Sequence, residues 1–85
     1  MIFLLTGGIE MEVAPHITID SRIHHGKAVI TGTRVPVSII VGSLAGGMTQ
    51  EKVRSEYVVT KAQIEAALAY AADIVSKTED FALAG

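Results

Sequence analysis

The chain contains no cysteine and no tryptophan, and it has only two prolines, two phenylalanines and two tyrosines in 85 residues. Without cysteine, a disulfide framework and a thiolate metal site are excluded, and nothing in the sequence requires an oxidising compartment. Charge is also sparse, because seven basic and nine acidic residues leave a net charge of −2. This balance is unlike that of a strongly basic nucleic-acid-binding domain. At this length the chain has room for one small domain, which excludes a multidomain enzyme.

Long hydrophobic runs are missing as well. The most apolar stretches are Ile2–Leu5 and Val35–Ala45, and the second contains Pro36 and Gly42. Both fall short of the ~18–20 residues of a membrane-spanning helix, and the N-terminus lacks the basic start of a signal peptide. We therefore expect a cytoplasmic protein that does not enter a membrane. Apolar residues nevertheless make up 49% of the chain, which predicts that apolar surface is covered by a second copy, as in a homodimer, or by another partner.

The charges are unevenly distributed along the chain. Residues 16–61 carry six basic and three acidic side chains, whereas the rest of the chain carries one lysine and six acidic side chains. The middle therefore has a net charge of +3 and the flanks have a net charge of −5. A mildly basic middle is compatible with a face that binds phosphate, although it is a weak signal for DNA binding.

The N-terminal part predicts a leader followed by a hairpin. Residues 1–15 contain Gly7, Gly8 and Pro15 and a second possible start at Met11, so we expect a flexible leader. Residues 17–20 alternate between apolar and polar, and residues 28–31 are rich in β-branched side chains. These patterns predict two short strands joined by a turn over 21–27.

Three helices are expected after the hairpin, over residues 37–45, 50–56 and 61–77. Thr49 has the position of an N-cap for the second helix, and Thr60 with Gln63 forms a capping box for the third. The third helix has an apolar stripe with helical spacing, made of Ile64, Ala67, Leu68, Ala71, Ile74 and Val75. The predicted domain covers residues 16–77, and residues 78–85 are expected to fray.

The first two helices are joined by Gly46-Gly47, and two helices with a tight glycine-bearing turn are typical of a helix-turn-helix. In that motif the second helix lies in the major groove and presents polar side chains to the DNA. The candidate DNA-binding residues are Thr49, Gln50, Lys52, Arg54 and Ser55. An ordinary helical hairpin with solvated charges is the alternative interpretation.

The connector before the first helix holds the sequence Gly32-Thr33-Arg34-Val35-Pro36. Pro36 disfavours the helical conformation at Val35, so the connector is expected to be extended. The planar guanidinium of Arg34 suits a carboxylate or a phosphate. Arg34 is therefore a candidate for contact with DNA, with a partner or with an acid in its own dimer. We favour a structural or interface role over a base contact.

His16, Asp20, His24 and His25 suggest a metal or acid–base site, as in a small hydrolase, but their spacing does not support one. Neighbouring histidines on extended chain point to opposite faces, and no two histidines are spaced four apart as a helical pair would be. Asp20 at a strand end is more typical of a turn. We therefore expect no enzymatic activity, no metal and no cofactor.

The third helix is rich in alanine around Tyr70, over residues 66–72. Small side chains allow close approach of a partner, and Tyr70 would then be an aromatic anchor of that interface. Simple helix propensity is the alternative explanation. We favour the interface, because the chain as a whole is apolar.

Several of these stretches resemble the small bacterial family labelled domain of unknown function 433. The resemblance is carried by Gly32-Thr33-Arg34-Val35-Pro36-Val37, by Gly47-Met48-Thr49 and by the alanine-rich helix, and it covers residues 17–74. Family members commonly have a Tyr-Pro element before the last helix, whereas this chain has Tyr57-Val58-Val59-Thr60 without proline.

This resemblance implies a mainly α fold, a winged or homeodomain-like helix-turn-helix with a short N-terminal β-hairpin. It also implies an antitoxin of the VapB type, which silences a PIN-like ribonuclease toxin and, with it, represses its own operon. The signature would be residues 32–36, and residues 49–56 would be the recognition helix. The alternative from a different class is a homo-oligomeric protein-interaction module without DNA binding.

Overall fold

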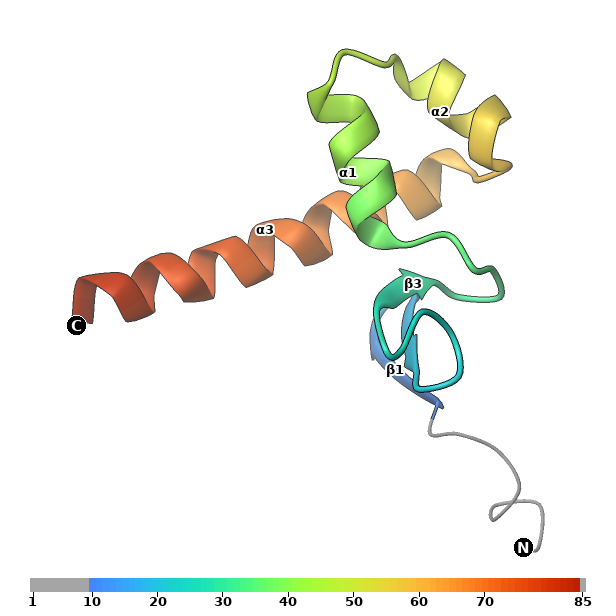
Figure 1. The fold of residues 1–85 in the computed structure, drawn as a ribbon. Helices are drawn as coiled ribbons and strands as arrows, with labels where there is room; N and C mark the ends of the chain where they lie inside the picture. Colours follow the sequence, from blue (N-terminus) through green and yellow to red (C-terminus); the bar gives the residue numbers. More distant parts are fainter. Residues whose placement is uncertain (1–9, 85) are drawn as a thin grey trace, which may run out of the picture.

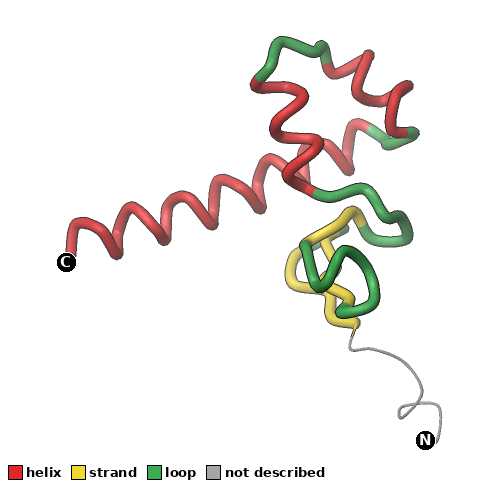
Figure 2. The backbone as a smooth tube through the Cα atoms, in the orientation of Figure 1, coloured by secondary structure: helices red, strands yellow, loops and turns green. Residues whose placement is uncertain are grey.

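The structure is a computed structural model that describes residues 10–84. It contains a three-stranded antiparallel sheet and three helices, and about half of the chain is helical (Figure 1). The sheet lies at one end of the molecule, below the helices (Figure 2). The elements are β1 (Glu10–Ala14), β2 (Ile17–Asp20), β3 (Ala28–Ile30), α1 (Val37–Ala45), α2 (Gln50–Tyr57) and α3 (Lys61–Ala84). The predicted hairpin and the three predicted helices are thus confirmed.

The sheet has the order β1-β2-β3, with β2 in the centre. β2 and β3 pair in the predicted antiparallel hairpin, with Ile17 opposite Ile30. The interior side of the sheet is apolar, because both of these isoleucines are fully buried. The hydroxyls of Thr18 and Thr31 are hydrogen-bonded at 2.6 Å, which ties β2 to the residue after β3.

β1 corrects the prediction for residues 10–14, which we expected to belong to a flexible leader. They form a strand that pairs with β2, with Met11 opposite Ile19 and an irregularity between Glu12 and Ala14. Met11 remains 56% exposed, so backbone pairing rather than burial holds this strand. The strand ends before Pro15, and the following His16, with φ of 66°, turns the chain into β2. Residues 1–9 of the predicted leader lie outside the described residues.

The helix ends follow the predicted caps. α1 begins directly after Pro36, and its last turn is followed by Gly46 and Gly47, of which Gly47 has φ of 105°. Thr49 caps α2 by accepting a hydrogen bond from the backbone N–H of Lys52 at 3.1 Å. Such a cap stabilises a helix by about 1 kcal/mol.

The capping box of α3 is also present. The backbone N–H of Thr60 donates to Gln63 Oε1 at 2.8 Å, and the backbone N–H of Gln63 donates to Thr60 Oγ1 at 3.1 Å. Two backbone donors at the start of α3 are therefore satisfied by side chains, as the sequence predicts.

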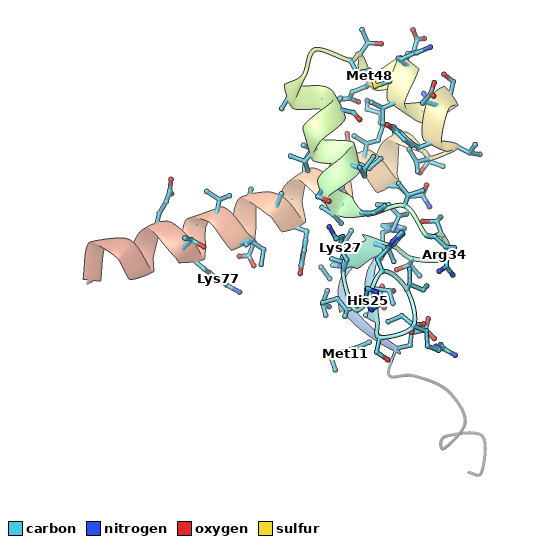
Figure 3. All side chains as sticks on the ribbon, in the orientation of Figure 1. Met11, His25, Lys27, Arg34, Met48 and Lys77 are labelled. Atoms are coloured by element: carbon cyan, nitrogen blue, oxygen red, sulfur yellow. The ribbon has the colours of Figure 1, made fainter. Side chains whose placement is uncertain are left out.

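α3 is longer than predicted, and its C-terminal half leaves the body of the molecule (Figures 1 and 3). The helix continues to Ala84 instead of ending at Lys77, and Thr78 Oγ1 donates to the carbonyl of Ile74 at 3.0 Å. Ile64 and Ala67 of the predicted stripe are fully buried, but Ile74 and Val75 are about half exposed. No helix in residues 10–84 is long and apolar enough to cross a membrane.

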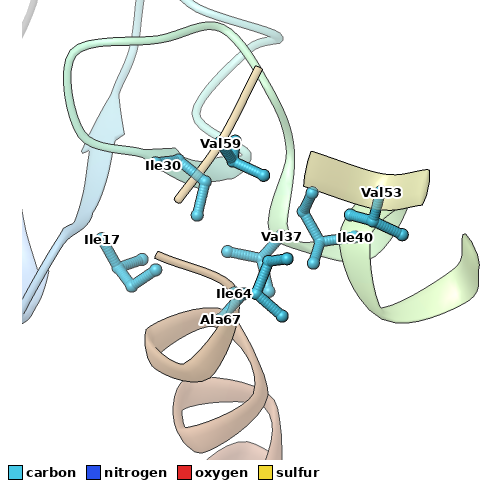
Figure 4. Packing of buried hydrophobic residues seen from close by; sticks show 8 residues of the cluster. All are labelled: Ile17, Ile30, Val37, Ile40, Val53, Val59, Ile64 and Ala67. Carbon is cyan, nitrogen blue, oxygen red and sulfur yellow. The ribbon is translucent and has the colours of Figure 1, made fainter. Parts of the chain in front are cut away.

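The core lies where β2, β3 and the three helices meet (Figure 4). Each of these elements contributes at least one fully or almost fully buried aliphatic side chain. Val53 of α2 and Ile40 of α1 are both completely buried, so α2 is anchored on the same core as α1. The buried cluster consists of Ile17, Ile30, Val37, Ile40, Val53, Val59, Ile64 and Ala67.

Candidate functional site

The connection between α1 and α2 is short and fixed at several points. The backbone N–H of Met48 donates to the carbonyl of Ser43 at 3.0 Å, and the backbone N–H of Gly47 donates to that of Leu44 at 3.1 Å. Across the helix pair, Ser43 Oγ and the Tyr57 hydroxyl lie 3.1 Å apart in a hydrogen bond. These contacts fix the direction of α2 relative to α1.

All five candidate DNA-binding residues are exposed to solvent on or just before α2. Thr49, Lys52, Arg54 and Ser55 line one shallow concavity, whereas Gln50 does not. The Thr49 hydroxyl and the Ser55 hydroxyl are engaged within α2, the first as the cap and the second as a donor to the carbonyl of Lys52. The basic side chains are therefore the groups of this set that reach outward for a ligand.

The concavity also contains residues that were not candidates for DNA binding, namely Glu51, Val58, Val59 and Thr60. Val58 follows α2 in a left-handed conformation, with φ of 55° and ψ of 53°, and its side chain is 84% exposed. This conformation is strained for a β-branched residue. A glycine at this position would predict a left-handed residue at the end of α2, whereas a valine does not.

The charges on α2 balance one another. Lys52 and Glu56 form an exposed pair at 3.7 Å, and Glu51 lies on the concavity beside Arg54. An exposed pair of this kind contributes little to stability. α2 therefore carries no net charge, and Arg54 is its basic side chain that forms no ion pair within residues 10–84.

The connector over residues 32–36 forms a compact turn centred on Thr33. The Thr33 hydroxyl donates to the carbonyl of Ile30 at 2.7 Å and accepts from the backbone N–H of Val35 at 3.0 Å. Gly32 has φ of 82°, and Pro36 makes a β-bridge with Val29. Thr33, Gly32 and Pro36 thus have structural roles in joining the sheet to α1.

Arg34 is exposed on this turn, below and away from α2 (Figure 3). Its backbone carbonyl oxygen forms a hydrogen bond with His24 Nε2 at 2.9 Å. Within residues 10–84 its guanidinium group makes no hydrogen bond or ion pair, although its charge contributes to lowering the pKa of Asp20. Arg34 therefore holds the turn through its backbone and leaves its charged group available to a ligand at the sheet end.

Asp20 is buried and belongs to the turn, as its position at a strand end predicts. Hydrogen bonds from the side chain of Arg22, and to a smaller extent from its backbone N–H, lower the pKa of Asp20 to about 2. His24 and His25 follow with φ of 49° and 58°. In the described part of the chain, no three His, Asp or Glu side chains lie together as metal ligands.

Tyr70, the predicted interface residue, is half-buried on α3 and packs against the edge of the core. It lines an apolar groove between α1 and α3. The candidate residues thus fall into three separate places: the α2 surface, the connector with Arg34, and the groove with Tyr70.

These features define a small domain of three helices and a three-stranded antiparallel sheet, in which the short, exposed α2 follows a glycine turn. A family model described as "Protein of unknown function (DUF433)" matches residues 17–71, and the chain belongs to this family. The resemblance to domain of unknown function 433 is thereby confirmed.

The domain is also similar to a solved structure, the crystal structure of Rv2018 from Mycobacterium tuberculosis. The two are 35% identical in sequence, with a TM-score of 0.57. The similarity covers 61% of this chain and 24% of the Rv2018 chain. A search of curated proteins gave no significant match.

Proposed function

We propose that this protein is a DNA-binding antitoxin of the VapB type, in which α1 and α2 act as a helix-turn-helix. In this proposal it binds operator DNA as a homodimer, silences a PIN-like ribonuclease toxin and represses its own operon. Its role is in the cytoplasm, is not enzymatic and needs no metal or cofactor. The family membership supports the antitoxin part, through the properties that the family resemblance implies.

The observation that carries DNA binding is the placement of α2. One side of this helix is anchored by the fully buried Val53, and its other side presents Lys52 and Arg54 on an open concavity. A helix held by its inner face and exposed on its outer face is what major-groove insertion requires. A homodimer would double the few phosphate contacts of one protomer, which suits a domain with little net positive charge.

The test is fluorescence anisotropy with DNA from upstream of the protein's own gene, at a series of salt concentrations. We expect binding that weakens as salt rises, and an Arg54→Gln variant that binds about tenfold more weakly. Arg34→Gln is the comparison variant, because it removes another exposed arginine, which lies on the connector and away from α2 (Figure 3). Binding without salt dependence, or equal losses in both variants, would refute α2 as the DNA-reading helix.

The toxin is tested separately, by capturing the tagged protein from its own host and identifying the proteins bound to it. A stoichiometric PIN-like ribonuclease that loses activity in the complex is the expected result. An absence of any such nuclease, both in the complex and beside the gene, would contradict the antitoxin role.

The second candidate function is a protein-interaction module without DNA binding. The balanced charges on α2 and the open apolar groove beside Tyr70 favour it. It predicts that the anisotropy measurement shows no salt-dependent binding at all.

A further inference from the structure

An apolar groove of about 450 Å³ lies between α1 and α3. α1 lines it with Val37, Val41 and Gly42, and α3 lines it with Tyr70, Ile74 and Val75. Ile74 and Val75 are 46% and 54% exposed. Large apolar side chains that remain open to water along a groove mark a contact site rather than a finished core.

Residues 72–79, in the second half of α3, also lack packing of their own. From position 72 to position 79 every residue is exposed, while the helix continues to Ala84. Isolated helices of about 12–15 residues are marginal in water, and helices in proteins are stabilised mainly by packing of an apolar face. Two features of the molecule are thus open to solvent and would be stabilised by packing against a partner. They are the groove and the projecting half of α3, residues 72–84.

We propose that a second copy of this chain covers both features at once. The projecting half of α3 from each protomer lies in the groove of its partner, so that the two α3 helices are antiparallel about a two-fold axis. A two-fold contact uses the same patch on both subunits, and this patch is self-complementary. Ile74 and Val75 belong both to the groove wall and to the projecting half, so the axis passes beside them.

The charges of the two features are complementary. Residues 73–80 contain three acidic residues and one lysine, and the carbonyl end of a helix adds partial negative charge. Lys27 lies on the rim of the groove and is exposed. The antiparallel arrangement brings the acidic half of one α3 toward Lys27 of the partner subunit. Gly42 and Ala71, which also line the groove, leave room for close approach of a helix.

A second copy suits these features better than an unrelated partner. A foreign helix in the groove would leave the projecting half of α3 exposed, whereas the exchange between two copies leaves neither feature uncovered. This inference gives the homodimer of the proposed function its surface, but it rests on the groove and α3 and does not require DNA binding.

The test is the molar mass in solution, measured by light scattering and sedimentation on the full chain without DNA. We expect the wild-type protein to be a dimer. Val75→Glu places two carboxylates together at the axis, so it should raise the dimer dissociation constant at least tenfold. Ile39→Glu is the matched control, because it changes another half-exposed aliphatic residue outside the groove and should leave the dimer intact. Circular dichroism of each variant checks that it folds.

Cross-linking gives a second measurement that needs no disruptive substitution. The chain has no cysteine, so a single Val75→Cys forms a disulfide only with its copy, and a position beside the axis meets the short Cα–Cα distance this requires. Ala62→Cys, at the packed end of α3, should not cross-link.

A wild-type monomer, a dimer unchanged by Val75→Glu, or equal cross-linking at positions 62 and 75 would overturn the inference. A dimer that binds no DNA would instead refute only the DNA-binding function, so the two failures are distinguishable.

Discussion

Asp20, the last residue of β2, and Arg22, in the turn that follows, are joined by three hydrogen bonds. The backbone N–H and Nε of Arg22 donate to Oδ1 of Asp20 at 2.8 and 2.9 Å, and Nη2 donates to Oδ2 at 2.7 Å. The carboxylate is almost completely buried, while Arg22 is largely exposed. The turn therefore depends on the charged form of one buried acid.

This dependence predicts a loss of stability in acid. The pKa of Asp20 in the folded protein is about 2, below its ordinary value of 3.8. The ionised form therefore stabilises the fold fully above about pH 4, and the effect is lost as the pH falls toward about 2. The melting temperature of wild type should fall more steeply over this interval than that of Asp20→Asn. Glu65→Gln, at an exposed position on α3, should keep the wild-type slope; equal slopes in all three proteins would contradict the prediction.

A second prediction concerns the strain at Val58. Val58→Gly removes the left-handed penalty of a β-branched residue and loses almost no packing, because the side chain is largely exposed. We expect urea unfolding to show a gain of about 1 kcal/mol. Val58→Ala removes the same methyl groups but keeps a Cβ in the left-handed conformation, so its gain should be smaller. A loss of stability in the glycine variant would show that Val58 has a packing role.

A third prediction separates the roles of two neighbours in the connector. Thr33→Val keeps the shape of the side chain but removes both hydrogen bonds of the hydroxyl, which should cost about 2 kcal/mol of folding free energy. Arg34→Gln should change it by less than about 0.5 kcal/mol, because its guanidinium is exposed. Chemical denaturation of both variants measures the difference. A larger loss at Arg34 than at Thr33 would reverse this assignment.

The sequence was most informative where a local rule decides the outcome. The caps at Thr49 and Thr60 and the glycine turn before Met48 are each set by a few neighbouring residues, and all three were predicted. The hairpin of β2 and β3 follows from alternation and β-branching in the same way. For the candidate site, exposure of the α2 residues also follows from helical periodicity around Val53.

Two of the misses, β1 and the exposed half of α3, depend on parts of the chain that are distant in sequence. β1 exists because its backbone pairs with β2, although its side chains are mostly exposed. The stripe on α3 correctly predicted burial of Ile64 and Ala67, but periodicity does not reveal where the supporting body ends. The conformation of Val58 could not be foreseen, because glycine or asparagine is the residue that normally adopts it.

The end of packing along α3 has a consequence for how such domains diversify. The family match ends at residue 71, and every residue from 72 to 79 is exposed. Substitutions in this segment therefore leave the internal packing of the domain intact. The surface of the projecting half can therefore change in evolution while the buried core of the domain stays the same.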